Sequence, residues 1–99
     1  MTTLTTPDTD TEQGTRLQPL WKVILHNDDV TTFDFVIELL RTLFHKEAAE
    51  AVRLTNEIHH GGSAVVAVTH KERAELYVEQ VRSLARPRGF PLTATIEPE

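Results

Sequence analysis

Cysteine is absent from this 99-residue chain, and methionine, tryptophan and tyrosine each occur once. Without cysteine the chain has no disulfide, no thiolate nucleophile and no cysteine-ligated zinc site. No apolar run approaches the ~20 residues of a membrane-spanning helix. The start of the chain has neither the basic region nor the apolar run of a secretory signal. We therefore expect a cytoplasmic protein that does not enter the membrane.

Positive charge is also scarce, because 10 lysines and arginines stand against 15 aspartates and glutamates, for a net charge of −5. A nucleic-acid-binding protein would need a basic stripe to neutralise phosphates, so this class of function is not expected. A chain of this length forms one small domain, which has little room for an internal enzyme cavity. A groove on the surface is therefore the kind of site to expect.

Apolar side chains are nearly missing from residues 1–19, where Leu4 and Leu17 are the only aliphatic residues beyond Met1. Such a segment buries too little apolar surface to offset its loss of conformational entropy. We expect residues 1–19 to form a disordered N-terminal extension and residues 20–99 to form the folded domain. The extension is either inert or used by a partner.

The domain begins with a predicted strand over residues 21–26. A helix follows from Thr31, which stands three residues before Asp34 in a variant of the capping box. The apolar face of this helix has helical spacing and consists of Val36, Leu39, Leu40, Leu43 and Phe44. A second, shorter helix is predicted over residues 47–56, and the glycine pair 61–62 breaks the pattern.

The valine-rich run over residues 64–68 predicts a central strand that helices cover on at least one face. Thr69 and Glu72 then form a capping box for a third helix, which ends at residues 87–89. The side chains expected to face inward from this helix are Ala74, Val78, Val81, Leu84 and Ala85. Residues 92–96 alternate between apolar and polar and predict the last strand.

The predicted order of elements is strand, helix, helix, strand, helix, strand. This order predicts an α+β fold in which three helices pack on one face of a small three-stranded, mostly antiparallel sheet (β-α-α-β-α-β). No internal repeat is visible in the sequence.

Two polar groups stand out as candidates for a functional site. The stretch HNDD at residues 26–29 directly follows the first strand, and His59 and His60 precede the glycine pair. Carboxylates and imidazoles can bind a metal ion. However, two consecutive histidines in the extended chain expected here point to opposite faces, and no HExxH spacing is present. The pattern therefore gives little support to a metal site.

Catalysis and cation recognition are two further roles that these residue types can serve. An aspartate and a histidine could supply two thirds of a catalytic triad, but Ser63 after two glycines is a weak nucleophile candidate. Asn27, Asp29 and a neutral His59 offer three acceptors, which suit the three donors of an ammonium group such as a peptide's α-amino group. A structural role also stays open, because Asn and Asp often cap their own backbone in turns.

Three segments resemble the ClpS family: WKVILHNDDVTTFDFVIELL, LTNEIHH and RGFPLTATIE. ClpS proteins are N-end rule adaptors that deliver substrates to Clp-type AAA+ unfoldase–protease machines for protein degradation. The resemblance runs from about Trp21 to Glu97 and covers nearly the whole expected domain. It implies an adaptor that is not an enzyme and that has no catalytic residue, cofactor or metal.

The resemblance further implies binding of N-degron proteins and peptides whose first residue is Leu, Phe, Tyr or Trp. Asn27, Asp29 and His59 match the residues that hold the α-ammonium group, and Asp28 is the neighbouring acid that supports them. The hydrophobic side-chain pocket is implied to consist of Leu25, Thr31, Phe33, Val36, Thr55, Ile58 and Leu92.

The implied protein partner is the N-terminal domain of a Clp AAA+ unfoldase, which a monomer of the chain would engage. Glu72 and Glu75 match the family's unfoldase-facing acids, and Tyr77 stands on the same surface where a lysine is usual. In this family the N-terminal extension is needed for handover of the substrate.

The sequence also departs from the family pattern near the pocket. Thr32 replaces a proline common at the first helical position, where the helix cap should survive. Phe33 and Thr55 stand where methionines are frequent, so we expect the size and specificity of the pocket to differ. One alternative is an unfoldase-docking domain of the same fold that does not recognise N-terminal residues. A metal-assisted hydrolase is the more distant alternative.

Overall fold

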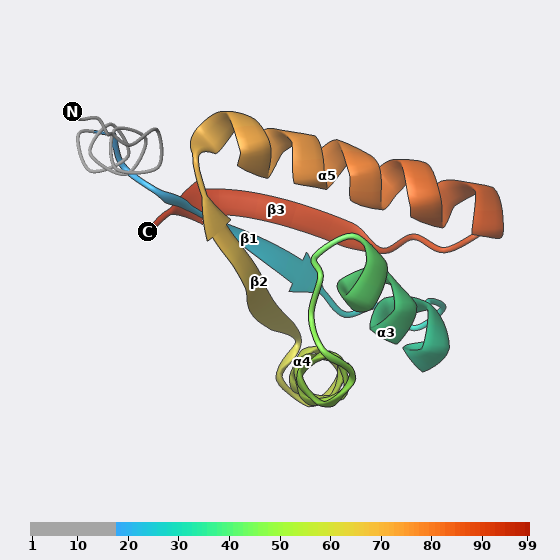
Figure 1. Ribbon diagram of the computed structural model, residues 1–99. Coiled ribbons are helices and arrows are strands. Elements are labelled where there is room, and N and C mark those ends of the chain that lie inside the picture. The colour runs from blue at the N-terminus through green and yellow to red at the C-terminus, as the bar shows by residue number, and fades with distance from the viewer. Residues whose placement is uncertain (1–17) are drawn as a thin grey trace.

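The computed structural model describes residues 18–99 (Figure 1). The extension predicted over residues 1–19 thus lies outside the described residues, except for its last two positions. Within the described part, three strands and three α-helices follow in the predicted order, which confirms the fold class. They are β1 (Trp21–His26), α3 (Phe33–Thr42), α4 (Ala48–Gly61), β2 (Ser63–Thr69), α5 (Lys71–Ala85), the 3₁₀ turn η1 (Arg86–Arg88) and β3 (Thr93–Pro98).

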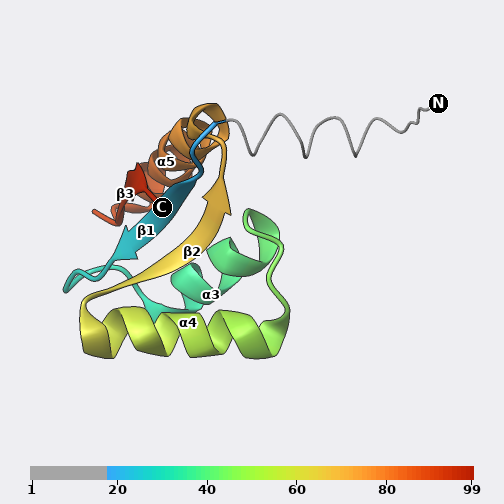
Figure 2. The same ribbon diagram turned by 90° about the vertical axis from the view of Figure 1, so that its left-hand side faces the viewer.

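β1 lies in the centre of the sheet, with β2 on one side and β3 on the other, and both strand pairs are antiparallel. Side chains on successive strand residues point to opposite faces, so one face of the sheet is buried. The buried residues of this face are Val23, Leu25, Ala64, Val66 and Ala94. The helices pack on this face. After β1 the chain turns toward α3 at the end of the sheet that lies near the C-terminal end of α4 (Figure 2).

The N-terminal cap of α3 is Thr32, one residue later than the sequence indicated. The Thr32 hydroxyl oxygen accepts a hydrogen bond from the Phe35 N–H at 3.2 Å. The hydroxyl of Thr31, the predicted cap, donates instead to the Asp28 carboxylate. The cap therefore survives the departure at position 32 because the threonine is itself the capping residue.

α4 runs on to Gly61, past the predicted end at residue 56. It stops at Gly62, whose φ of 94° lies in the left-handed region that glycine adopts without strain. The Gly62 N–H closes the last turn on the Ile58 carbonyl at 2.9 Å. His59 and His60 therefore lie in the last turn of a helix, and the expectation that they lie in extended chain was wrong.

The start of α5 also differs from the prediction. Thr69 is the last residue of β2, where it pairs with Trp21, and the N-cap of α5 is His70, so the capping box from Thr69 to Glu72 does not form. Leu84 was expected to face inward but is 48% exposed, while Ala85 beside it is fully buried. Neighbouring residues on a helix point ~100° apart, so only one of the two faces the core.

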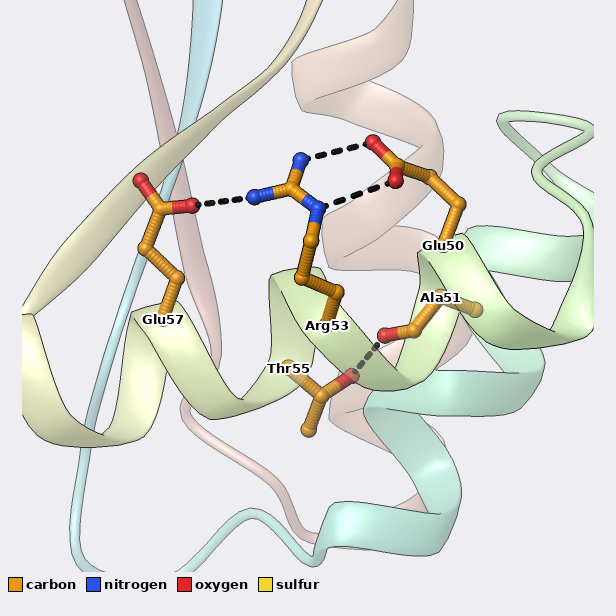
Figure 3. A network of polar contacts seen from close by, with 5 residues as sticks. All are labelled: Glu50, Ala51, Arg53, Thr55 and Glu57. Atoms are coloured by element: carbon orange, nitrogen blue, oxygen red, sulfur yellow. Dashed lines mark hydrogen bonds and ion pairs between the residues drawn. The ribbon is translucent and has the colours of Figure 1, made fainter.

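The two faces of α4 have different roles, which Figure 3 shows from close by. On the outer face Arg53 donates hydrogen bonds to Glu50 at 2.7 and 3.0 Å and to Glu57 at 3.2 Å. Solvent screens this exposed network, so it contributes little to stability. On the inner face the Thr55 hydroxyl donates to the Ala51 carbonyl at 2.7 Å. The hydroxyl of Thr55 is thus satisfied within its own helix.

Candidate functional site

The turn after β1 is built around the Asp28 carboxylate. Its Oδ1 accepts hydrogen bonds from the backbone N–H groups of Val30 at 2.8 Å and Thr31 at 2.7 Å, and its Oδ2 accepts from the Thr31 hydroxyl at 2.7 Å. Burial by itself raises the pKa of Asp28, but the hydrogen bonds from Thr31 and Val30 and the charge of Arg86 together leave the pKa below its ordinary value. Asp28 is therefore a charged group that holds the turn in shape.

The other acceptors near this turn have no hydrogen-bond partner among the residues that the structure describes. Within residues 18–99, the side chains of Asn27, Asp29 and His59 make no hydrogen bond or ion pair. All three are exposed. They contrast with Asp28, whose two oxygens already accept three hydrogen bonds. The site thus separates one aspartate that maintains the structure from polar groups that remain available to a ligand.

Two elements bring His59 to the turn. The Asn27 N–H donates to the Gly62 carbonyl at 2.9 Å, which ties the end of β1 to the end of α4. The His59 ring then stands between two aromatic neighbours, with ring centres 4.9 Å from Phe33 and 5.0 Å from His60 and interplanar angles of 76° in both cases. Its orientation is set by edge-to-face packing, which leaves its nitrogen atoms free to bond a ligand.

A small pocket of about 20 Å³ opens beside these groups. Its wall joins the turn, the start of α3, the inner face of α4 and the segment before β3. The lining residues are His26, Asn27, Asp28, Thr31, Thr32, Phe33, Val36, Thr55, Ile58, His59 and Leu92. This volume has room for about one water molecule and is far below that of ligand sites, so a bulky side chain could enter only if the wall residues move apart.

Two residues predicted for the site do not lie on the pocket wall. Leu25 is fully buried in the core beneath it, and Asp29 is exposed beside it. The other predicted residues, for both the ammonium group and the side chain, line the pocket. The structure therefore places Asp28, and not Asp29, against the cavity.

His26 and Thr32 also line the pocket. The sequence indicated His26 only as part of the HNDD stretch and gave it no role in the pocket. His26 ends β1 on the face opposite Leu25, and its Nε2 bonds the Thr95 hydroxyl at 2.7 Å. Thr32 was considered only as a substitute for a proline. The signal that could have identified both was their position next to residues already assigned to the site.

The surface of α5 contains the three residues matched to unfoldase binding. Glu72 and Glu75 are exposed, whereas Tyr77 is half-buried. The Tyr77 ring packs on Phe44 with ring centres 4.6 Å apart, and the Arg73 guanidinium lies 5.5 Å from its centre. Tyr77 is thus partly a packing residue, which the sequence did not indicate.

A larger hollow of about 550 Å³ runs along the exposed side of α3 and is open to solvent. It is lined by Asp34, Ile37, Glu38, Arg41, Thr42, His45 and Lys46. With one apolar side chain among seven, it lacks the hydrophobic wall that small ligand sites have. The narrower pocket at the turn is therefore the stronger candidate site.

In the described residues, no group of three or more His, Cys, Asp or Glu side chains is placed to hold a metal ion. The helices of residues 18–99 include none that is long and apolar enough to cross a membrane.

The family model for the ATP-dependent Clp protease adaptor protein ClpS matches residues 16–95. The chain belongs to the ClpS family. The resemblance seen in the sequence is thereby confirmed, and as a ClpS protein the chain is an adaptor of the Clp protease.

Curated relatives support this membership over most of the chain. The ClpS adapter of Nautilia profundicola is 50% identical over 78 residues, which cover 79% of this chain and 80% of that protein. The ClpS adapter of Desulfatibacillum aliphaticivorans is 42% identical over 91 residues, which cover 92% and 88% of the two chains. Among solved structures, Agrobacterium tumefaciens ClpS2 bound to L-phenylalaninamide matches with a TM-score of 0.79 and 38% identity, covering 82% of this chain and 98% of that one.

Proposed function

We propose that this ClpS protein binds proteins whose first residue is bulky and hydrophobic (Leu, Phe, Tyr or Trp) and delivers them to a Clp AAA+ unfoldase for degradation. The observation that carries the proposal is the set of acceptors without a hydrogen-bond partner beside an apolar pocket. Asn27 and His59 line that pocket, and Asp29 lies close in sequence at the same turn. An α-ammonium group has three donors and no acceptor, so it complements these groups.

The two aspartates have different parts in this proposal. Asp28 faces the pocket and supplies a fixed negative charge, while its hydrogen bonds to Thr31 and Val30 keep the turn in place. Asp29 is exposed and adds negative charge near the mouth. Direct hydrogen bonds to the ammonium group are therefore assigned to the Asn27 carbonyl oxygen and to an unprotonated ring nitrogen of His59.

The first side chain of the substrate would enter the apolar part of the pocket, between Phe33, Val36 and Ile58 with Leu92 below them. Agrobacterium tumefaciens ClpS2 was solved with L-phenylalaninamide, a ligand that combines a free α-amino group with an aromatic side chain. A similar ligand class is supported here by a similar fold and by the combination of acceptors and apolar wall.

The proposed unfoldase surface lies away from the pocket. α5 begins near the start of β1, where the Lys71 ammonium lies 5.0 Å from the centre of the Trp21 ring. The pocket lies at the other end of β1, and six strand residues at ~3.3 Å each span about 17–20 Å. Glu72 and Glu75 in the first turns of α5 could therefore contact the N-terminal domain of an unfoldase while a substrate occupies the pocket.

A fluorescence-anisotropy titration tests the recognition step. We compare a Phe-initiated peptide with a free α-amino group, the same peptide after N-acetylation, and a Ser-initiated control. Acetylation removes the charge and leaves the acceptors without their donor, which typically costs ~2–5 kcal/mol, or more than tenfold in affinity. Equal binding of the acetylated peptide would exclude an ammonium site. Absence of binding by all three peptides would favour a docking domain that does not recognise N-terminal residues.

A further inference from the structure

The least exposed apolar residue of the pocket wall, Leu92, comes from a part of the sequence that is far from the other lining residues. Leu92 is 1% exposed and belongs to the segment between η1 and β3, whereas the other lining residues lie between positions 26 and 59. Pro91 precedes Leu92 and has no N–H with which to anchor the segment. The position of Leu92 must therefore be fixed by a hydrogen-bond donor other than the Pro91 backbone.

Arg86 provides this anchor. Its Nη1 donates hydrogen bonds to the carbonyl oxygens of both Phe90 and Leu92, each at 2.9 Å. One terminal nitrogen of a guanidinium has two hydrogens, so it can serve both acceptors, which stand on either side of Pro91. The backbone adds two bonds that close the preceding turn, from the Gly89 N–H to the Arg86 carbonyl at 2.9 Å and from the Phe90 N–H to the Ala85 carbonyl at 3.1 Å.

The same guanidinium also acts on a second residue of the pocket wall. Its positive charge favours the ionised form of the Asp28 carboxylate, which shapes the turn after β1. Arg86 is thus connected to two residues of the pocket wall, to Leu92 through a hydrogen bond to its backbone carbonyl and to Asp28 through charge. It does not line the pocket itself.

We propose that Arg86 is a positioning residue that fixes Leu92 at the base of the pocket and thereby determines how well the largest first residues are accommodated. This inference rests on the proposed function of the pocket as a site for the first side chain of a substrate. A lysine keeps the charge, and its ammonium has hydrogens for two acceptors, but its flexible stem is less pre-organised to hold both carbonyls than a guanidinium. It should restore the effect on Asp28 better than the position of Leu92.

The test uses the full chain and three variants: Arg86→Met, Arg86→Lys and the control Arg82→Met. Arg82 lies on the exposed side of α5 and pairs only with Glu79 in the described residues, at 3.2 Å. Affinities are measured for Phe-initiated and Leu-initiated peptides, together with melting temperatures. The methyl NMR signals of Leu92 are recorded without peptide.

For Arg86→Met we expect about a tenfold loss of affinity for the Phe peptide and a threefold or smaller loss for the Leu peptide, because the larger ring reaches further toward Leu92. Arg86→Lys should lie between Arg86→Met and the wild type. Arg82→Met should stay within about twofold for both peptides. The Leu92 methyl signals should shift in Arg86→Met and remain in place in Arg82→Met.

Equal losses for the two peptides in Arg86→Met, in parallel with a lower melting temperature, would show a merely structural role and overturn the inference. Unchanged affinities would also overturn it. If Arg86→Met does not fold, the ratio of the two affinities in Arg86→Lys decides the question. If the wild type binds neither peptide, the proposed function fails, and unmoved Leu92 methyl signals would then separately exclude the positioning role.

Discussion

The ring of Phe33 meets the ring of His59 edge-on, with ring centres 4.9 Å apart and an interplanar angle of 76°. Both rings line the pocket, and Phe33 is nevertheless 41% exposed. One residue thus forms part of the apolar wall and also steadies the histidine that we assign to the ammonium group. A change at Phe33 should therefore affect both parts of ligand recognition.

We predict that the wild type prefers peptides that begin with Phe, Tyr or Trp over those that begin with Leu, and that Phe33→Leu weakens this preference. An aromatic ligand can pack against the Phe33 ring, and such pairs are worth about 0.5–1.5 kcal/mol, or roughly 2- to 12-fold in affinity. A titration of four peptides against both proteins measures the ranking. Val30→Ala is the control, because Val30 is 56% exposed and lies outside the pocket wall. An unchanged ranking in Phe33→Leu would remove Phe33 from the specificity determinants.

The two aspartates of the turn should separate stability from binding. Asp28→Asn replaces the oxygen that accepts the hydrogen bond of the Thr31 hydroxyl. It also removes the negative charge of the group to which two backbone N–H groups donate. We therefore expect the free energy of unfolding to fall by about 1 kcal/mol. Asp29→Asn should leave stability unchanged and weaken peptide binding at low salt. Urea unfolding and peptide titrations of both variants make the comparison. Equal stability of the two variants would contradict the role assigned to Asp28.

The pH dependence of stability provides a second measurement on Asp28. Because the pKa of Asp28 is lower in the folded state, the folded protein binds fewer protons in this range and stability rises with pH. The contribution of Asp28 should be complete above its ordinary pKa of 3.8 and lost as the pH falls through the lowered folded value. The difference between wild type and Asp28→Asn should accordingly shrink below about pH 4, and a constant difference would contradict the assignment.

The position of Thr55 predicts different results for two substitutions. Its hydroxyl bonds the Ala51 carbonyl, so Thr55→Val removes no group that a ligand needs, and affinities should stay within about twofold. Thr55→Met adds volume to the side chain that lines a pocket of only about 20 Å³. We expect it to favour Leu over Trp as the first residue. The measurement is the ratio of the affinities for Leu-initiated and Trp-initiated peptides. An equal ratio in the wild type, Thr55→Val and Thr55→Met would show that the side chain at position 55 does not limit the size of the first residue that the pocket accepts.

Much of the fold could be predicted because local patterns and tertiary packing agree. The first strand lies at residues 21–26 as expected, and the valine-rich strand differs by one residue at each end. The length of α4 could not be predicted in the same way. Ile58 continues the buried face of Ala51 and Leu54, and this packing extends the helix to a glycine pair that was interpreted only as a break.

The composition of the site was easier to predict than the roles of its members. The sequence placed three acceptors near one turn, but it could not show which aspartate would be used by the backbone. That distinction depends on the conformation of residues 28–31, where the Asp28 oxygens meet two N–H groups and a hydroxyl. The contact of Tyr77 with Phe44 was also beyond prediction, since it joins segments that are separate in the sequence. The hydrogen bonds of Arg86 to Phe90 and Leu92 are local, but they depend on the conformation of the turn after α5.

The surface of α5 should distinguish docking from packing. We predict that Glu75→Lys weakens binding to the unfoldase N-terminal domain without changing peptide affinity or stability, because Glu75 is exposed. Tyr77→Ala should lower stability by about 1–2 kcal/mol, because it removes a half-buried ring from Phe44. Pull-down or calorimetry with the unfoldase domain, together with thermal melts, tests both variants. Full unfoldase binding by Glu75→Lys would place the docking surface elsewhere.

Deletion of residues 1–17 should separate substrate binding from delivery. The segment lies outside the described residues, and the pocket wall described within residues 18–99 is formed by side chains between positions 26 and 92, so we expect peptide affinity to change by less than about twofold. Because the resemblance to ClpS proteins implies that the extension serves handover, we expect slower degradation of a Leu-initiated reporter by the partner unfoldase and protease. The control replaces the segment with a Gly/Ser linker of equal length, which stays flexible and keeps the reach of the chain. If the linker restores degradation, length matters and the sequence of the extension does not, whereas full activity of the deletion itself would show that the extension is inert.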